Sequence, residues 1–377
     1  MKPKILFAVQ GEGRGHMTQA ISLRQLLERN GFEVCGVIVG TSTRREIPAY
    51  FLKQFEGIPV ERLQSPNFVT RKNRGIHIAA TAWQNLLRLR TYLRSARKLR
   101  ALVEDRQPDL IVNFYEPLVA IYARTVRHRP PIICIAHQYL GGHTEFTYPP
   151  RHFFDRVFLD SYTRFTATGA ERLLALSFYP LVNEPKKKIF VVPPLLRREV
   201  KQQTITQQNY FLCYLLNAGY RSDIENWHKA NRNVRLHVFT DLVSDKEEIQ
   251  LHENLWFHRL SDTRFLEMMA GCSGLVSSAG FESICEAMYL GKPALMVPVE
   301  GHFEQLCNAH DGQRAGAGIF ATRFDIGKFM EWLPSYSNRM QEFREWEAQS
   351  ERLFVMHVRE VLSQSLKEEE HFAVAPV

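Results

Sequence analysis

The sequence is poor in several features that mark large classes of proteins. No apolar run approaches the ~18 residues that a membrane-spanning helix needs, so no such helix is expected. The six cysteines form no Cys-x-x-Cys pair and mostly lie in apolar segments, which favours buried, reduced thiols over disulfides or a zinc site. No Asp-x-Asp pair is present to chelate a divalent cation. We therefore expect no metal.

The chain begins with an apolar segment that is too short for a signal peptide. Residues 5–9 lead into a glycine-rich loop rather than a cleavage site, so they are expected to form the first buried strand of a cytoplasmic protein. The 377 residues suffice for two domains, and 45% hydrophobic with 23% charged residues indicates a globular protein. A formal charge of +8 favours an anionic partner, which leaves nucleic acid, an anionic membrane surface and a phosphorylated substrate open.

Short apolar runs alternate with helical stretches along most of the chain. A helix is expected over residues 17–29, because Asn30-Gly31 suits its C-terminal end. This alternation predicts an α/β fold with parallel, doubly wound sheets. The expected strands are residues 5–9, 32–39, 110–114, 132–136, 165–167 and 189–192, then 210–216, 234–239, 255–257, 275–277 and 294–297.

A change in composition divides the chain. Residues 197–208 are polar and are expected to link a first domain, 1–196, to a second, 209–335. The remaining residues, 336–377, are charged and are expected to form one long helix from 338 to about 366, with a frayed tail. Because ligands of open α/β sheets bind beyond the carboxyl ends of the strands, the two domains are expected to face each other across a ligand-binding cleft.

Residues 277–286 carry the most informative pattern, Ser-Ser-Ala-Gly-Phe-Glu-Ser-Ile-Cys-Glu. The small residues at 277–280 allow a phosphate to approach the backbone. A helix that starts near Phe281 would direct its unpaired N–H groups and positive dipole end at that phosphate. Glu286 would lie about one turn further along, where a carboxylate can accept hydrogen bonds from a ribose. Glu304 and Gln305 offer groups that suit a hexose, so the region predicts a sugar-nucleotide site.

A second candidate loop, Gln-Gly-Glu-Gly-Arg-Gly-His at 10–16, follows the first strand. It departs from the Gly-x-Gly-x-x-Gly dinucleotide fingerprint because position 16 is histidine, and the second expected strand ends without an acidic residue. A nicotinamide enzyme is therefore disfavoured. His16 can take a proton from an acceptor hydroxyl, or it can simply cap the helix. Arg14 can contact a phosphate, or it can remain solvated.

Two residues that follow later strands have open roles. Glu116 can orient His16 or act as a base itself, but an acidic residue before Pro117 can equally cap a helix. His137 is a candidate contact to an acceptor.

With these motifs the chain resembles two-domain nucleotide-sugar glycosyltransferases of the GT-B type. It looks closest to a bacterial and archaeal group with a Gly-x-Gly-Arg-Gly-His start, and it is more distantly similar to the MurG peptidoglycan transferases and the UDP-glycosyltransferases. The resemblance covers most of the chain, with its motifs in residues 10–16 and 277–316. It implies two Rossmann-like domains and a C-terminal helix that crosses back onto the first.

The resemblance also implies a role for each matching residue. His16 corresponds to the general base, and Glu116 matches an acidic partner found in some relatives. The positions implied to bind substrate are Gly13, Arg14, Gly15, His137, Asn217, Gly219, Arg259, Leu260, Ser278, Ala279, Gly280, Phe281, Glu282, Ser283, Glu286, Glu304, Gln305 and Asn308. Of these, 278–283 and Asn308 would hold the diphosphate, the loop of Asn217 would face it, and Arg259 with Leu260 would read the base.

The implied reaction is transfer of a hexose from a nucleotide sugar, with uracil as the base, to an acceptor hydroxyl of a lipid or another small molecule. The donor is a co-substrate, so no cofactor is expected. A helix N-terminus, Arg14 and Lys292 would neutralise the leaving diphosphate without a metal. Analogy with the resembled families implies inversion. Two alternatives stay open at this point: a sugar-nucleotide epimerase of similar fold and a non-catalytic sugar-nucleotide-binding protein.

Residues 71–106 form a basic stretch with ten Lys or Arg and two acidic residues. Within it, residues 83–103 are expected to form an amphipathic helix. Its apolar stripe comprises Leu86, Leu89, Leu93, Ala96, Leu99 and Val103, and its basic face comprises Arg90, Arg94 and Arg97. The helix can be packed with a solvated basic side, or it can bind an anionic membrane surface or a phosphate-bearing acceptor. The second reading places the protein at the inner face of the membrane. Nucleic acid is not expected, because aromatic residues are not interleaved in a binding pattern.

Overall fold

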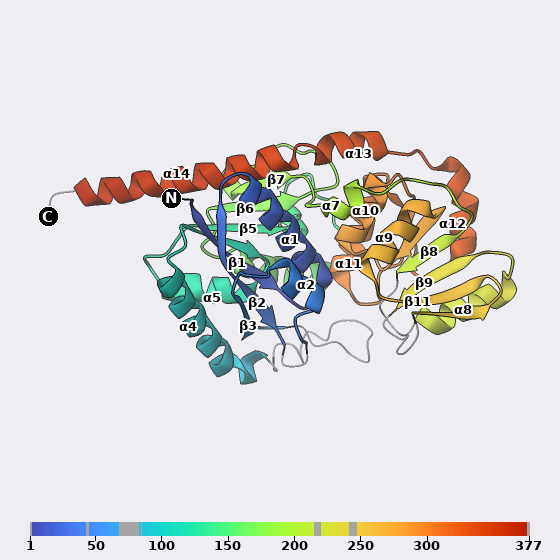
Figure 1. Ribbon diagram of the computed structural model, residues 1–377, viewed down its shortest axis with the longest axis horizontal. Coiled ribbons are helices and arrows are strands. Elements are labelled where there is room, and N and C mark those ends of the chain that lie inside the picture. Colours follow the sequence, from blue (N-terminus) through green and yellow to red (C-terminus); the bar gives the residue numbers. More distant parts are fainter. Residues whose placement is uncertain are drawn as a thin grey trace.

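The computed structural model describes residues 2–42, 45–67, 83, 85–214, 220–240 and 247–374. It contains two α/β domains that lie side by side, each built on a seven-stranded sheet (Figure 1). The expected fold class, two doubly wound Rossmann-like domains of the GT-B type, is confirmed.

The sheet of the first domain is entirely parallel, in the order β3-β2-β1-β4-β5-β6-β7. Its strands are β1 (Lys4–Gln10), β2 (Glu33–Thr41), β3 (Val60–Gln64), β4 (Leu110–Phe114), β5 (Ile132–Ala136), β6 (Arg172–Leu176) and β7 (Ile189–Val192). Both faces of the central strands are buried, as the continuous apolar runs predict. The helices that cover them are α1 (Arg14–Arg29), α2 (Ala49–Gln54), α4 (Leu89–Arg106), α5 (Pro117–Thr125) and α6 (Phe153–Thr166), with a 3₁₀ turn at His137–Gly142.

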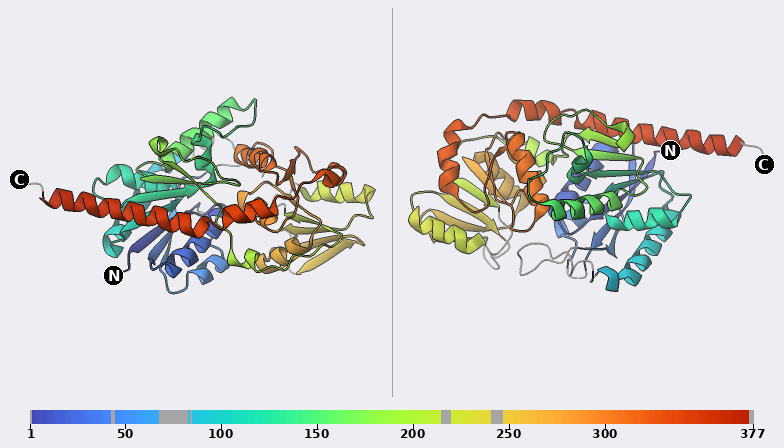
Figure 2. Two further views of the ribbon diagram at one scale, coloured as in Figure 1. Left: turned by 90° about the horizontal axis from the view of Figure 1, so that it is seen from above. Right: turned by 180° about the vertical axis from the view of Figure 1, so that it is seen from behind.

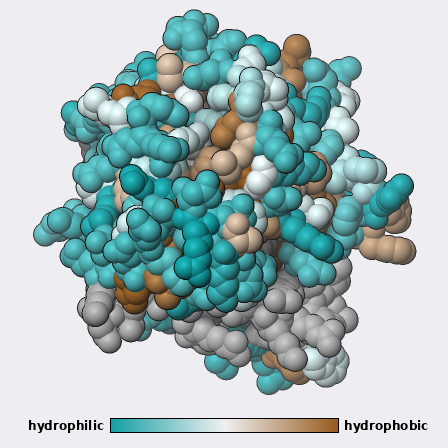
Figure 3. Space-filling model, turned by 90° about the vertical axis from the view of Figure 1, so that its right-hand side faces the viewer, coloured by the Kyte–Doolittle hydropathy of each residue, from teal (hydrophilic) through white to brown (hydrophobic). Residues whose placement is uncertain are grey.

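The second sheet has the order β10-β11-β9-β8-β12-β13-β14, and only its β10–β11 edge is antiparallel. Its strands are β8 (Phe211–Tyr214), β9 (Leu236–Thr240), β10 (Glu248–His252), β11 (Leu255–Arg259), β12 (Gly274–Ser277), β13 (Ala294–Met296) and β14 (Gly318–Phe320). The accompanying helices are α8 (Tyr220–Ala230), α9 (Asp262–Gly271), α10 (Phe281–Tyr289), α11 (Phe303–Arg314) and α12 (Ile326–Trp332). On the face that this domain turns outward, the described apolar residues are scattered among hydrophilic ones (Figure 3).

One element of the fold closes the two domains on each other through an apolar contact. Phe281, the first residue of α10, packs against Phe178 and His137 of the first domain, with ring centroids 4.6 and 4.2 Å apart. Phe281 is 7% exposed. The N-terminus of α10 is therefore held at the boundary between the domains.

The C-terminal segment crosses back onto the first domain, as the resemblance implied, but it is two helices rather than one. The helices α13 (Met340–Glu347) and α14 (Ser350–Val374) are separated by a turn at 348–349. Trp346 donates from Nε1 to the carbonyl oxygen of Ser177 at 2.9 Å. Along α14, Glu360 pairs with Arg172. Figure 2 shows α14 lying across the first domain and extending past it.

The strand expected at 165–167 is wrong, because these residues end α6 and the strand β6 follows at Arg172–Leu176. The edge strands β3, β10 and β14 were not expected; β14 has only three residues, and the side chains of β3 and β10 are mostly exposed, so none of them has a long apolar run. The helix expected over 83–103 turns at Arg88, and α4 runs on to Arg106.

The residues 197–208 contain the short helix α7 (Arg198–Lys201), and the expected domain boundaries stay a prediction. All six cysteines are free, and all but the partly buried Cys35 are buried. No helix among the described residues is both long enough and apolar enough to cross a bilayer.

Candidate active site

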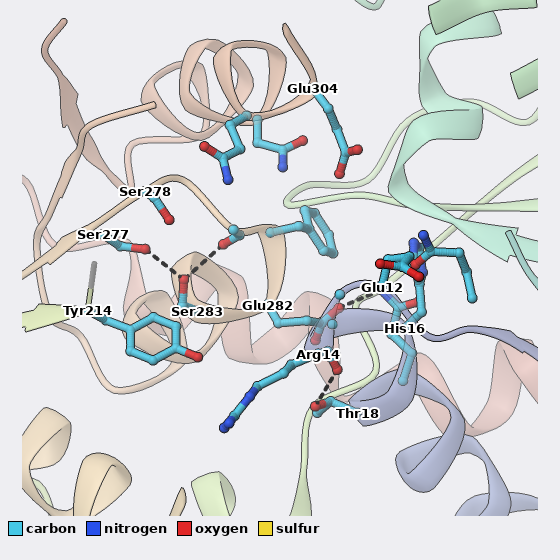
Figure 4. A pocket seen from close by; sticks show the side chains of 18 of the residues that line it. Glu12, Arg14, His16, Thr18, Tyr214, Ser277, Ser278, Glu282, Ser283 and Glu304 are labelled. Carbon is cyan, nitrogen blue, oxygen red and sulfur yellow. Dashed lines mark hydrogen bonds between the residues drawn. The ribbon is translucent and has the colours of Figure 1, made fainter. Parts of the chain in front are cut away.

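A pocket of about 880 Å³ lies between the two domains. The first domain contributes the loop after β1 and the start of α1, and the second contributes the loop after β12 and the starts of α10 and α11. In Figure 4, Tyr214, Ser278 and Ser283 lie on the second-domain side of this pocket, and His16 and Thr18 lie on α1. The predicted residues that line it are Gly13, Arg14, Gly15, His16, His137, Leu260, Ser278, Gly280, Phe281, Glu282, Ser283, Glu286, Glu304, Gln305 and Asn308.

The turn before α10 has the geometry of an anion-binding site. The helix begins at Phe281, as predicted, and its N-cap residue Gly280 makes no side-chain capping bond, so the first N–H groups are left for a ligand. Ala279 is fully buried with a φ of 61°, which turns the chain sharply at this point. Asn308 supports the turn from α11, because its Nδ2 donates to the carbonyl oxygen of Ala279 at 3.0 Å.

Glu286 is held by a residue that the sequence analysis assigned only to the linker. Arg197 donates from Nε and Nη2 to Oε1 of Glu286, at 2.7 and 2.6 Å. Burial raises the pKa of Glu286, and the adjacent Arg197 opposes that rise. Both contacts use the same carboxylate oxygen, so Oε2 is available to a ligand. No signal in the sequence could have identified Arg197, because it is one polar residue among many in the linker.

Glu304 and Gln305 differ in how they meet the pocket. Gln305 accepts a hydrogen bond from the backbone N–H of Val299 at 2.9 Å, which fixes its amide. No hydrogen bond or ion pair within the described part of the chain engages the carboxylate of Glu304, which points into the pocket (Figure 4). Glu304 is therefore free to accept from a ligand hydroxyl.

His16 lies in the first turn of α1, which starts at Arg14 after the uncapped Gly13. Its Nδ1 is 3.2 Å from Oε1 of Gln19, and its ring stacks on Tyr115 with centroids 5.7 Å apart. Burial lowers the pKa of His16 from 6.5, against an opposing effect of Glu304. The ring is therefore neutral at pH 7, which is the state that a general base requires.

Arg14 reaches across the pocket toward the second domain. Its guanidinium lies 3.7 Å from the carboxylate of Asp262 at the start of α9, and Arg197 approaches the same oxygen at 3.9 Å. Both cations therefore stand beside the pocket at the level of α10. Lys292 does not join them, because its ammonium donates to the carbonyl oxygen of Thr206 in the linker.

Glu116 lies outside the pocket lining and is fully buried at the N-cap of α5. Its Oε1 accepts from Ser65 Oγ at 2.5 Å and from the N–H of Leu118 at 3.0 Å. Burial raises its pKa to about 8. These contacts are the ones that a helix cap makes. Among the described residues, Gln19 rather than Glu116 contacts Nδ1 of His16. A catalytic role for Glu116 stays a prediction.

The remaining predicted positions are placed as follows. His137 is buried beneath Phe281, and its Nδ1 is 2.8 Å from the carbonyl oxygen of Leu176, so it joins the domains at the pocket wall. Arg259 is exposed and does not line the pocket, unlike its neighbour Leu260. Asn217 and Gly219 fall outside the described residues. Within the described ranges, no group of three His, Cys, Asp or Glu side chains is arranged to hold a metal ion.

Two facing Rossmann-like domains with a pocket between them have the architecture of the GT-B fold. Residues 3–334 match the family described as glycosyl transferase family 1. Because this match covers most of the chain, the protein belongs to that family and is a glycosyltransferase.

Comparisons with individual proteins agree with this assignment. The chain is 24% identical over 347 residues to an uncharacterized glycosyltransferase of Methanosarcina acetivorans, covering 84% of this chain and 82% of that one. It is 22% identical over 351 residues to the UDP-N-acetylglucosamine–N-acetylmuramyl-(pentapeptide) pyrophosphoryl-undecaprenol N-acetylglucosamine transferase of Leuconostoc mesenteroides, covering 85% of each.

Among solved structures, the fold matches the glycotransferase of kitacinnamycin with a TM-score of 0.62 at 17% identity, covering 94% of this chain and 99% of that one. It matches CalG4, the calicheamicin glycosyltransferase, with a TM-score of 0.60 at 16% identity, covering 97% and 99%.

Proposed function

We propose that this glycosyltransferase moves a hexose from a UDP-sugar to an acceptor hydroxyl with inversion at the anomeric carbon and without a metal. One observation carries the proposal: the pocket places a neutral histidine, His16, on one wall and the uncapped N-terminus of α10 on the other. A base and an anion-binding helix end are the two groups that such a displacement requires.

The proposed reaction follows from this arrangement. Nε2 of His16 takes the proton of the acceptor hydroxyl while the oxygen forms a bond to the anomeric carbon. The bond from that carbon to the diphosphate breaks, and the departing UDP carries the electron pair. The N–H groups of α10, with Arg14 and Arg197 nearby, stabilise its negative charge. Glu286 would bind the ribose through Oε2, and Glu304 would bind the hexose.

Nucleotide-sugar turnover tests the proposal directly. The full chain is incubated with UDP-glucose, UDP-galactose and UDP-N-acetylglucosamine, with and without a panel of lipid-phosphate and small acceptors, and UDP release is measured. We expect release that depends on acceptor, and a product of inverted configuration. Conversion of the donor alone into another sugar nucleotide would instead identify an epimerase, and tight UDP binding without any turnover would identify a binding protein.

His16→Ala tests the assignment of the base. We expect turnover to fall by about 10²-fold or more, with the affinity for UDP nearly unchanged. The control is His128→Ala, because His128 is an exposed residue outside the pocket lining. A variant that loses UDP affinity but keeps its turnover number would contradict the assignment.

We also propose that the acceptor is lipid-linked and that the protein meets it at an anionic membrane surface. Residues 71–82 and 84 of the basic stretch lie outside the described residues, but its described part from Trp83 to Arg94 supports this. Of its expected apolar stripe, Ala96, Leu99 and Val103 are buried, whereas Leu86 and Leu89 are 61% and 47% exposed. Leu87 and Trp83 are likewise exposed, beside the exposed Arg90 and Arg94. Apolar side chains flanked by arginines suit an interfacial contact. The printed name of the Leuconostoc relative includes an undecaprenol-linked acceptor.

Vesicle sedimentation tests this surface. We expect binding to vesicles that contain phosphatidylglycerol, and weak binding to phosphatidylcholine alone. The double variant Leu86→Ser with Leu87→Ser should lose most of the binding, because each of these exposed leucines would bury its apolar surface when it enters the membrane interface. Ile249→Ser is the matched control, since Ile249 is an exposed apolar residue of the second domain. Equal sedimentation of the double variant and the wild type would reject the membrane proposal.

A further inference from the structure

A buried amide connects the histidine of the first domain to a carboxylate of the second. Gln19 lies three residues after His16 on the same face of α1, and it is 3% exposed. Its Oε1 is 3.2 Å from Nδ1 of His16, and its Nε2 donates to Oε1 of Glu282 on α10 at 2.6 Å. In Figure 4, Glu282 extends from α10 toward α1. The three side chains form a continuous hydrogen-bonded chain across the domain boundary.

We propose that Gln19 is a positioning residue that sets the tautomer of His16 according to the protonation state of Glu282. When Glu282 is ionised, its carboxylate accepts from the amide nitrogen, and the amide oxygen is directed to His16. When Glu282 is protonated, its O–H donates to the amide oxygen, and the amide nitrogen is directed to His16. The role of His16 as a base rests on the function proposed above, whereas the tautomer itself does not.

The chemistry of the groups leaves two satisfied arrangements. An amide oxygen accepts only, so in the first arrangement Nδ1 of His16 must carry the proton, and Nε2 is left with a lone pair for an acceptor hydroxyl. An amide nitrogen donates only, so in the second arrangement Nδ1 accepts and the proton lies on Nε2, where it blocks the base. Because each group can serve in both arrangements, the amide can reverse while it keeps a hydrogen bond to both His16 and Glu282.

The surroundings of Glu282 allow its protonation to change near neutral pH. Burial raises the pKa of Glu282 to about 8; Gln19 opposes this rise, Glu286 on the same helix adds to it, and Arg197 from the linker opposes it. Its second oxygen, Oε2, is buried without a partner among the described residues. His16 faces Glu304 from α11 and Tyr115 from the loop after β4. Since burial lowers the pKa of His16, the ring stays neutral while Glu282 titrates.

The arrangement also makes the tautomer of His16 depend on contact between the two domains. Gln19 and His16 belong to α1, but the carboxylate that orients the amide belongs to α10. A separation of the domains would remove Glu282 and leave the amide free to present either end. The productive tautomer is therefore set only when the donor-binding helix lies against α1.

Nitrogen-15 NMR of the full-length protein tests the proposal without a substrate. With histidines labelled, the signals of His16 are assigned by their loss in His16→Gln, and the shifts of its two ring nitrogens are followed as the pH is raised through 8. We expect the proton to move from Nε2 to Nδ1 across this range in the wild type. In Glu282→Gln we expect no change across pH 8. A wild-type tautomer that does not change, or a Glu282→Gln variant that behaves like the wild type, would overturn the proposal.

Two further variants separate positioning from packing. Gln19→Met keeps the volume but can neither fix Nδ1 nor bind Glu282, so the transition at pH 8 should disappear. Gln25→Met makes the same change further along α1, outside the pocket, and should retain the transition. The double variant Gln19→Glu with Glu282→Gln restores an acceptor for Nδ1 and a donor for that acceptor, and it should hold the proton on Nδ1 above and below pH 8. Failure of this pair to restore the tautomer would count against the relay.

If the proposed transferase activity is detected, its kinetics should depend on Gln19 and Glu282 in the same way as the tautomer of His16. Gln19→Met should lower kcat by about 10²-fold with little change in KM for the sugar nucleotide. Wild-type kcat should rise with pH through about 8, and that limb should be absent in Glu282→Gln. Absence of all turnover would refute the proposed function while leaving the NMR result to decide the relay.

Discussion

Replacement of Arg197 by methionine tests how the proposed ribose site is held. Arg197 and Glu286 have side chains that are 17% and 3% exposed, and the guanidinium contacts one carboxylate oxygen at 2.6 to 2.7 Å. Removing one member of a buried pair costs about 3–5 kcal/mol of stability when the other stays charged. Burial already raises the pKa of Glu286, so the carboxyl in the variant would protonate instead, and we expect the lower end of that range.

The same change should weaken UDP binding. A protonated Glu286 offers the ribose a poorer acceptor, and a hydrogen bond to a charged group contributes about 1.5–3 kcal/mol. A loss of about 2 kcal/mol corresponds to a Kd that is about 30-fold higher. Because loss of Arg197 raises the pKa of Glu286 further, the affinity of the variant for UDP should recover only at a higher pH than that of the wild type.

Isothermal titration calorimetry with UDP, together with thermal unfolding, measures both effects. Arg100→Met is the matched control, since it removes an exposed ion pair with Glu104 on α4 and should change neither quantity measurably. Glu286→Gln should resemble Arg197→Met, and the two losses should not add in the double variant. Wild-type affinity in Arg197→Met at pH 7 would refute the idea that this pair prepares the ribose site.

Three other changes test the cap, the crossing helix and the turn. Glu116→Gln removes a buried group whose pKa is raised to about 8. Because the folded state keeps this proton up to about pH 8 and the unfolded state loses it near 4.5, wild-type stability should fall by at most about 1.4 kcal/mol per pH unit as the pH rises from 4.5 to 8, and the slope should be smaller in the variant. An unchanged kcat in the variant would favour the capping role. Trp346→Phe leaves the carbonyl oxygen of Ser177 without its indole donor, and urea unfolding should show a loss of about 1–3 kcal/mol. Ala279→Val places a branched side chain at a positive φ in a fully buried turn, and it should lower stability by about 2 kcal/mol and weaken UDP binding measured by calorimetry.

Local patterns were sufficient for most of the buried strands, though not for β6, and for the start of α10. The strands β4 and β5 are buried on both faces, so their apolar residues are continuous in the sequence. Gly280 and the serines near it indicated a turn before Phe281, because the residues that form a tight turn are neighbours in the sequence. The edge strands β3 and β10 gave no such signal, since their side chains are mostly exposed and their pairing is decided by another segment.

The same distinction holds for the candidate site. His16, Glu286 and Glu304 were found because each lies at a fixed spacing from a turn or strand end. The partners of these residues were not found, because the sequence pattern indicates only an ordinary helix position for Gln19 and a polar linker residue for Arg197. Their importance arises from contacts with residues far away in the sequence: Gln19 bonds Glu282 across the domain boundary, and Arg197 in the linker bonds Glu286.

The sequence by itself therefore determined the two α/β halves, the turns that begin α1 and α10, and the residue types proposed to bind a sugar nucleotide, because these depend on interactions within a few positions of the chain. Only the tertiary structure decided that Arg197 holds Glu286 and that Gln19 joins His16 to Glu282. Those pairs join residues that are 89 and 263 positions apart. Only the folded arrangement of the two domains brings their buried polar atoms within hydrogen-bonding distance.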